Sequence, residues 1–229
     1  MRRLSIIIVF TGIVLAAIFF AKKYKITSFV CVSQFNKCSD EVLGVVNNTK
    51  RGDLLSTRKE LVKRLSDDPL VKKYALQLNL HGQYVIHIEE RTPAFCIKGS
   101  KGVYIADAEG LVIKNENDSN MRCVSKEDVD YKLGEKLSEE DYFVQRLIYK
   151  LRNISEIGDV NIEGDNLIVE YKGKIKLIFP SEGDLDSLSG KAYYTVSQFD
   201  NIEEYIIKSG KISLSKIDFR FKHPVIQII

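Results

Sequence analysis

The stretch that decides the fold is DPLVKKYALQLNLHGQYVIHIEERTPAFCIKGSKGVYIADAEGLVI, residues 68–113. Two runs of alternating side chains, 71–80 and 84–91, flank a turn at Gly82 and predict two strands joined as a hairpin. Pro93 interrupts this pattern, and short alternating runs separated by glycines follow it. The order predicts that one small module ends near Pro93 and that a second module of different character begins there.

The residues upstream of the hairpin predict one strand and two helices. Residues 26–32, ITSFVCV, are rich in β-branched and aromatic side chains and predict a strand. Ser39 has the position of an N-cap for a short helix, and Thr57 with Glu60 forms a capping-box pattern before a second helix. The resulting order of strand, helix, helix, strand, strand predicts a compact module over residues 25–92.

Residues 93–229 carry the pattern of a larger, mainly antiparallel β domain with flanking helices. Short strands are predicted at 94–98, 103–107, 111–114, 159–163, 166–171 and 174–179. Apolar side chains at helical spacing predict helices at 139–153 and 190–208. The last segment, 216–229, reads as a strand. Because Pro224 cannot donate to a ladder, that strand is expected to lie at a sheet edge or to have a bulge at Pro224. The predicted fold class is therefore α+β.

The N-terminal segment differs from the rest because residues 4–21 hold no charge between basic flanks. As a helix the segment would be about 27 Å long, close to the hydrocarbon thickness of about 30 Å. We expect a single transmembrane helix at 4–21 after a short cytoplasmic tail at 1–3. A cleaved signal peptide is the alternative, but its apolar run usually measures about 7–15 residues.

Composition excludes some functions. The chain of 229 residues is 45% hydrophobic and 28% charged, as in ordinary globular proteins. Its net charge is only +3, and lysines and arginines are mixed with acidic residues throughout. Because a nucleic-acid binder usually shows a dense basic stripe, we expect no nucleic-acid partner.

The cysteines allow two interpretations. Cys31 and Cys38 are seven positions apart, and a disulfide across the short loop between them is geometrically feasible outside the cytosol. The alternative is that all four cysteines are buried thiols that act as small hydrophobic side chains. There is no Cys-x-x-Cys pattern and no zinc spacing, so no metal site is predicted.

The chain offers little for catalysis. Its three histidines are His81, His87 and His223, and there is no glycine-rich phosphate loop. The best enzymatic alternative is an anchored thiol enzyme of the sortase type, with Cys96 or Cys123 as nucleophile. Neither cysteine lies in that family's T-L-x-T-C context. We expect no catalytic residue, no cofactor and no small-molecule substrate.

Four motifs together resemble one family. Residues 61–72 resemble a family helix that ends before a Pro-aromatic-Val strand, although Leu70 stands at the position where tryptophan is commoner. IHIEERTPA at 86–94 resembles an I-x-I-x-E-R-x-P junction. YIADAEGLV at 104–112 resembles an x-L-I-D-x-x-G-x-V hairpin, and IDFRF at 217–221 is similar to V-D-L-R-Y/F. In this order, and with the apolar segment, they resemble the FtsQ/DivIB cell-division proteins.

The resemblance implies a single-pass type II protein of the cytoplasmic (inner) membrane at the division septum. It further implies a POTRA domain at 25–92 and a β domain at 93–229, both extracytoplasmic. Such proteins are non-catalytic scaffolds that bind FtsB, FtsL and other divisome components. The alternative is a POTRA-type chaperone in protein translocation or outer-membrane assembly, although those chaperones usually carry several POTRA repeats.

Glu89, Arg91 and Pro93 mark the predicted joint between the two modules. The arginine is expected to pair with carboxylates there, while the proline restricts the backbone. A partner-binding role for Arg91 is the alternative interpretation.

The predicted partner-binding site is the C-terminal strand, at Ile217, Asp218, Phe219, Arg220 and Phe221. An edge strand has unpaired N–H and C=O groups, so a partner segment can add to it as a further strand. Arg220 is the candidate for an acidic residue on an FtsB-like partner. In the alternative, Ile217, Phe219 and Phe221 are core residues and the edge binds nothing.

Overall fold

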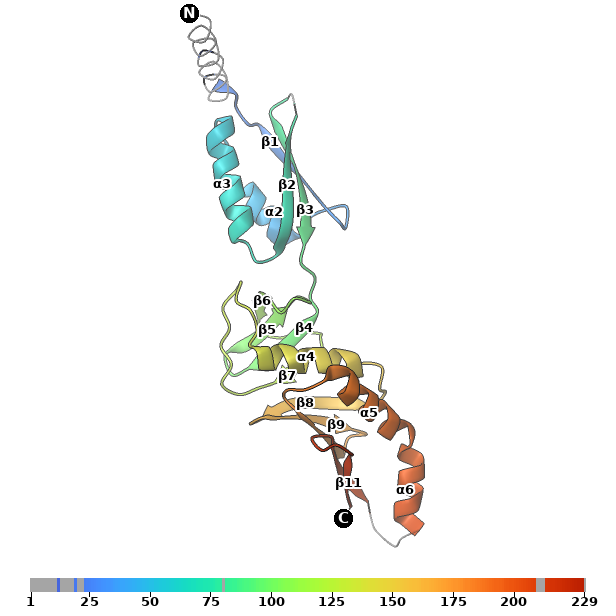
Figure 1. Ribbon diagram of the computed structural model, residues 1–229. Coiled ribbons are helices and arrows are strands. Elements are labelled where there is room, and N and C mark those ends of the chain that lie inside the picture. Colours follow the sequence, from blue (N-terminus) through green and yellow to red (C-terminus); the bar gives the residue numbers. More distant parts are fainter. Residues whose placement is uncertain (1–11, 13–18, 20–22, 80, 209–212, 229) are drawn as a thin grey trace, which may run out of the picture. The chain divides into compact units, whose positions relative to one another are not determined.

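Figure 1 shows the fold in a computed structural model of the chain. The structure describes Gly12, Phe19 and residues 23–79, 81–208 and 213–228. Apart from Gly12 and Phe19, the predicted tail and transmembrane helix at 1–21 lie outside the described residues. Within those residues, none of the helices has the length and apolar character that crossing a bilayer requires. The chain divides into two compact units that meet between Thr92 and Pro93.

The first unit is a three-stranded sheet with two helices on one face (Figure 1). Its elements are β1 (Ser28–Ser33), α2 (Asp40–Asn47), α3 (Leu54–Asp67), β2 (Val71–Leu78) and β3 (Gln83–Glu90). The predicted order of strand, helix, helix, strand, strand is confirmed. The central strand β3 is parallel to β1 and antiparallel to β2. Val42, Leu61, Leu65 and Ile86 are fully buried between helices and sheet.

The two helices of this unit begin at polar caps, one predicted and one not. Ser39 caps α2, as expected, because its hydroxyl accepts a hydrogen bond from the Val42 N–H. The capping box at Thr57 is wrong, since α3 has its N-cap at Asp53, four residues earlier. Asp53 accepts hydrogen bonds from the N–H groups of Leu55 and Ser56, each at 3.0 Å. A carboxylate also complements the positive end of the helix dipole, which favours this earlier start.

The second unit is built on a nine-stranded mixed sheet. Its strands are β4 (Phe95–Gly99), β5 (Gly102–Ala106), β6 (Val112–Glu116), β7 (Val124–Ser125), β8 (Ile157–Glu163), β9 (Asn166–Tyr171), β10 (Ile175–Pro180), β11 (Leu214–Asp218) and β12 (Val225–Ile228). Their spatial order is β12-β11-β10-β9-β8-β7-β4-β5-β6. The pairs β10–β11, β4–β7 and β7–β8 are parallel, and the other neighbouring pairs are antiparallel. The α+β class is confirmed.

Helices α4 (Glu139–Leu151), α5 (Leu185–Ser197) and α6 (Phe199–Lys208) belong to the second unit. Leu147, Leu151 and Leu188 pack with strands β8 to β11 in one core.

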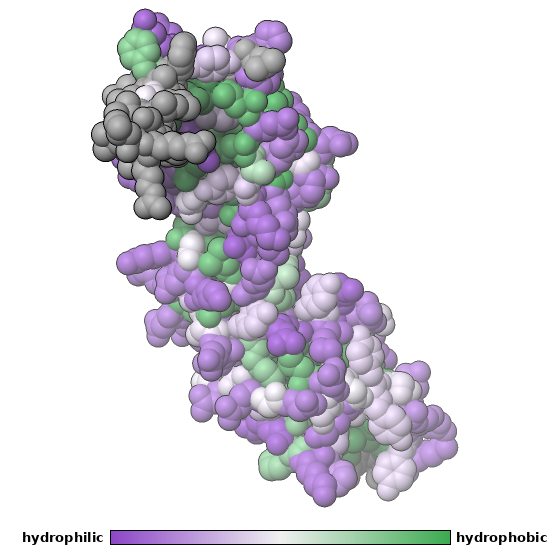
Figure 2. Space-filling model, turned by 45° about the horizontal axis from the view of Figure 1, so that its top comes forward, coloured by the Kyte–Doolittle hydropathy of each residue, from purple (hydrophilic) through white to green (hydrophobic). Residues whose placement is uncertain are grey.

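Polar residues predominate on the surface in Figure 2, with hydrophobic residues in small groups between them.

The single helix predicted at 190–208 is wrong, because α5 and α6 are separate helices. Gln198 leaves helical geometry, and its N–H bonds the carbonyls of Tyr194 and Thr195. Phe199 then enters the core beside Tyr171, with 5.4 Å between ring centres. Burial of this large ring favours the break in the helix.

Candidate partner-binding site

The structure separates the five predicted site residues into core and surface. Ile217, Asp218 and Phe219 are buried, and the Phe219 ring stacks on Phe179 with 4.7 Å between centres. Arg220 and Phe221 are exposed in the segment that follows β11. Ile217 and Phe219 are therefore core residues, as the alternative interpretation predicted.

The prediction that residues 217–221 form a sheet edge is wrong. Strand β11 lies between β10 and β12, so its hydrogen-bonding groups face a strand on each side. The predicted single strand at 216–229 is a hairpin, in which Asp218 faces Val225. Residues 219–224 reverse the chain, and Pro224 directly precedes β12, where its missing N–H does no harm to the ladder. The edge strand is therefore β12.

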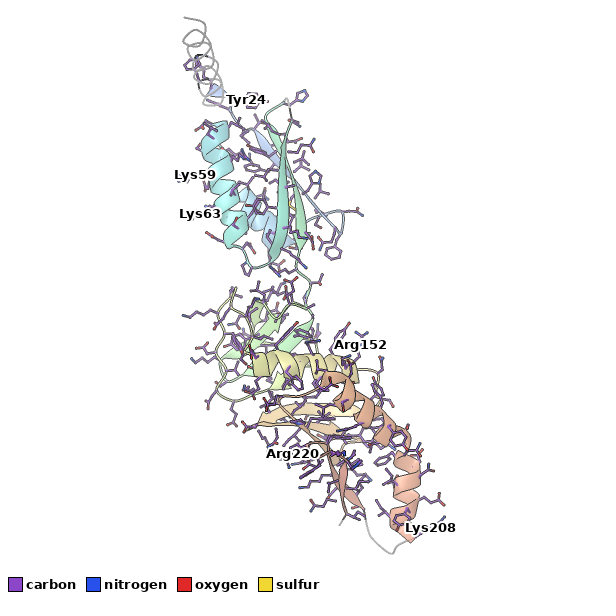
Figure 3. All side chains as sticks on the ribbon, viewed as in Figure 1. Tyr24, Lys59, Lys63, Arg152, Lys208 and Arg220 are labelled. Atoms are coloured by element: carbon purple, nitrogen blue, oxygen red, sulfur yellow. A yellow bond between two sulfur atoms is a disulfide. The ribbon has the colours of Figure 1, made fainter. Side chains whose placement is uncertain are left out.

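Arg220 is bound to its own unit. Its guanidinium donates to both carboxylate oxygens of Asp218, with Nε–Oδ1 2.9 Å and Nη2–Oδ2 2.5 Å, and Nη1 donates to Asn166 Oδ1 at 2.9 Å. These hydrogen bonds hold the pKa of the Asp218 carboxyl below its ordinary value. Figure 3 shows Arg220 beside the last strands of the sheet. Arg220 thus fixes the beginning of the β11–β12 connection.

The β12 edge is apolar and exposed. Its sequence is Val-Ile-Gln-Ile, without a charge, and Val225 and Ile226 are 49% and 37% exposed. Proteins usually protect edge strands with charges, prolines or bulges, because unpaired backbone groups there attract other strands. The opposite edge, β6, ends in Lys114-Asn115-Glu116 and has that protection. Of the two edges, β12 is better suited to accept a further strand.

The register shows what each face of β12 presents. Ile226 lies opposite the buried Ile217, and Ile228 lies opposite the buried Leu214. Residues that face each other across an antiparallel pair point to the same side of the sheet. Ile226 and Ile228 therefore extend the core face to the edge of the sheet. Sequence reasoning missed this arrangement, although Pro224 marks a point where the strand pattern can be interrupted.

The predicted joint residues lie at the end of β3 and just beyond it. Glu89 forms ion pairs with Lys72 and Lys73 of β2, with Nζ–O distances of 3.8 and 3.3 Å. The Arg91 N–H donates to the carbonyl of Leu70 at 2.8 Å, which prolongs the contact with the start of β2. Pro93 is exposed and is the first residue of the second unit.

All four cysteines are joined in disulfides. Cys31 is bonded to Cys38, with 5.8 Å between Cα atoms, and Cys96 is bonded to Cys123, with 4.5 Å between them. The second pair has no recognisable spacing in the sequence. Because Cys96 and Cys123 are joined to each other, neither offers the free thiolate that a sortase-type enzyme needs. Among the described residues, no group of three His, Cys, Asp or Glu side chains is placed to hold a metal ion.

Comparison with known proteins finds a cell-division relative. No protein-family model matches the chain. The cell division protein DivIB of Clostridium tetani (strain Massachusetts / E88) is 31% identical to it over 163 residues. This similarity supports the resemblance of the chain to the FtsQ/DivIB family. The family resemblance inferred from the four motifs is thereby confirmed. The alignment covers 66% of this chain and spans 60% of the relative's length.

Proposed function

We propose that the chain is a non-catalytic scaffold of the bacterial divisome. Residues 4–21 anchor it in the cytoplasmic membrane, and both units are extracytoplasmic at the division septum. The first unit is the POTRA domain and the second is the β domain. The DivIB relative supports a role in cell division. The uncharged segment at 4–21 supports a membrane anchor. The strand–helix–helix–strand–strand order of the first unit supports its assignment as a POTRA domain.

The observation that carries partner binding is the exposed, apolar edge of β12. An FtsB-like or FtsL-like partner adds a strand there, so that backbone hydrogen bonds continue the sheet. Because Ile226 and Ile228 extend the core face, the partner strand is expected to carry apolar residues at alternate positions on that face. Arg220 contributes indirectly, since its bonds to Asp218 hold the chain that leads into β12.

The test is co-purification of the full chain with the FtsB-like protein encoded by the same genome. Ile226→Lys places a charge on the exposed edge and is expected to weaken binding at least about tenfold, or about 1.4 kcal/mol. Asn115→Lys places the same charge on the opposite edge, β6, and serves as the matched control. Thermal unfolding shows whether both variants fold.

Two outcomes contradict the proposal of binding at β12. In one, folded Ile226→Lys binds as tightly as the unchanged chain. In the other, both substitutions weaken binding equally, which would mean that added charge rather than the β12 edge is responsible.

A further inference from the structure

One end of the first unit is assembled from three segments that are distant in sequence. The Leu54 N–H donates to the Tyr24 carbonyl at 3.0 Å, and the Ile26 N–H donates to the Gly52 carbonyl at 2.9 Å. The Thr27 N–H donates to the Gly82 carbonyl at 2.8 Å. Figure 3 shows Tyr24 beside the start of α3. Residues 23–27, 50–56, 79 and 81–83 therefore form one surface, named here the basic end.

The basic end has a marked excess of positive charge. Lys23, Lys25, Lys50 and Arg51 are all exposed on it. Among the described residues of the three segments, Asp53 is the single carboxylate. The Asp53 side chain already accepts the capping hydrogen bonds of α3. Four cations against one engaged carboxylate make this surface complementary to an anionic partner.

An apolar side chain lies within the same surface. Leu55, in the first turn of α3, is 45% exposed. The mixture of lysines, an arginine and an exposed leucine is typical of surfaces that bind a membrane interface. There the cations reach the headgroups and the apolar side chain enters the acyl boundary.

Chain connectivity places this surface close to the uncharged segment. Two residue steps separate Ala21, the last residue of that segment, from Lys23, so the gap is at most about 7 Å. The backbone bonds described above then hold 50–56 against 23–27. We propose that the basic end binds the anionic headgroups of membrane phospholipids. This inference rests on the membrane anchor of the proposed function.

The experiment uses the full chain reconstituted in bilayers of phosphatidylcholine, alone or mixed with phosphatidylglycerol. The chain contains no tryptophan, so a single introduced tryptophan is a unique fluorescent reporter. Leu55→Trp reports on the basic end. Phe35→Trp is the matched control, because Phe35 is also exposed but follows β1, a strand about 20 Å long that begins near the basic end.

Brominated lipid should quench Leu55→Trp about twofold more in the anionic bilayer than in the neutral one, and this excess should fall at about 1 M salt. Phe35→Trp should show no such difference. Quenching of Leu55→Trp that is equal in both bilayers overturns the inference.

Charge variants in the Leu55→Trp chain test the cause. Replacement of Lys25, Lys50 and Arg51 by glutamine should remove the additional quenching that the anionic bilayer causes. Replacement of Lys37, Lys63 and Lys73 by glutamine removes the same charge elsewhere in the unit and should leave the excess in place. If the two triple variants behave alike, the effect reflects net charge, and the basic end is not the binding surface.

Alkaline carbonate extraction from the neutral bilayer distinguishes failure of the lipid-binding inference from failure of the proposed membrane anchor. If the chain is extracted, the proposed anchor fails and this inference fails with it. If the chain is retained but shows no anionic excess, the anchor stands and only the lipid-binding inference is overturned.

Discussion

The side-chain amide of Gln145 makes two hydrogen bonds with the backbone of Cys96. Its Nε2 donates to the Cys96 carbonyl at 2.8 Å, and its Oε1 accepts from the Cys96 N–H at 3.4 Å. Gln145 is 4% exposed, on α4, and Cys96 is fully buried on β4. The helix thus supplies polar partners to a strand inside the second unit.

Gln145→Ala is expected to destabilise the second unit by about 1–3 kcal/mol, because both Cys96 backbone groups lose a partner in a buried site. Urea unfolding measures the change. Arg146→Ala, at the exposed neighbouring position, is the control and should cost less than about 1 kcal/mol. Equal losses of unfolding free energy in the two variants would show that the hydrogen bonds of the Gln145 amide do not stabilise the unit.

A second prediction concerns the buried ion pair of Asp141. Its carboxylate is bonded to Lys126 Nζ at 2.7 Å and to the Tyr131 hydroxyl at 2.5 Å, and its side chain is 2% exposed. Lys126→Met leaves the carboxylate without its ammonium partner and should cost about 3–5 kcal/mol. The exposed pair Lys101–Asp130 is the comparison, and Lys101→Met should cost less than about 1 kcal/mol. Similar losses for both lysines would contradict the role assigned to burial.

A third prediction concerns acid stability. Hydrogen bonds from Arg220 lower the pKa of Asp218 in the folded chain, so the unfolded chain binds more protons near that pKa. The stabilisation is therefore fully present above the unfolded pKa of about 3.9 and is lost as the pH falls through the lower folded pKa.

Arg220→Met removes the cause of this shift. Relative to the unchanged chain, the variant should be less stable at neutral pH, and the difference should shrink below about pH 4. Unfolding free energies measured across pH test this, with the exposed Lys222→Met as the control. A difference that does not change with pH would mean that Arg220 stabilises the chain through packing and its bond to Asn166 rather than through the Asp218 carboxylate.

The local signals in the sequence predicted most of the elements. Alternation predicted β2, β3 and β9, and Ser39 marked the start of α2, since side-chain period and capping chemistry depend on residues close in sequence. The same signals failed at Asp53 and Gln198. At Asp53, side-chain hydrogen bonds set the start of α3. At Gln198, backbone hydrogen bonds and the buried ring of Phe199 set the end of α5.

The sequence by itself determined the resemblance to the FtsQ/DivIB family, the element order of the first unit and the α+β class, because short motifs and periodicity carry them. Only the tertiary structure decided which strand forms the edge of the sheet. Ile217 lies between the charged residues Lys216 and Asp218 yet is buried, whereas Ile226 lies in the uncharged run Val-Ile-Gln-Ile yet is 37% exposed. The difference arises because β10 pairs with β11 across a long sequence separation, and alternation within one segment holds no information about such a partner.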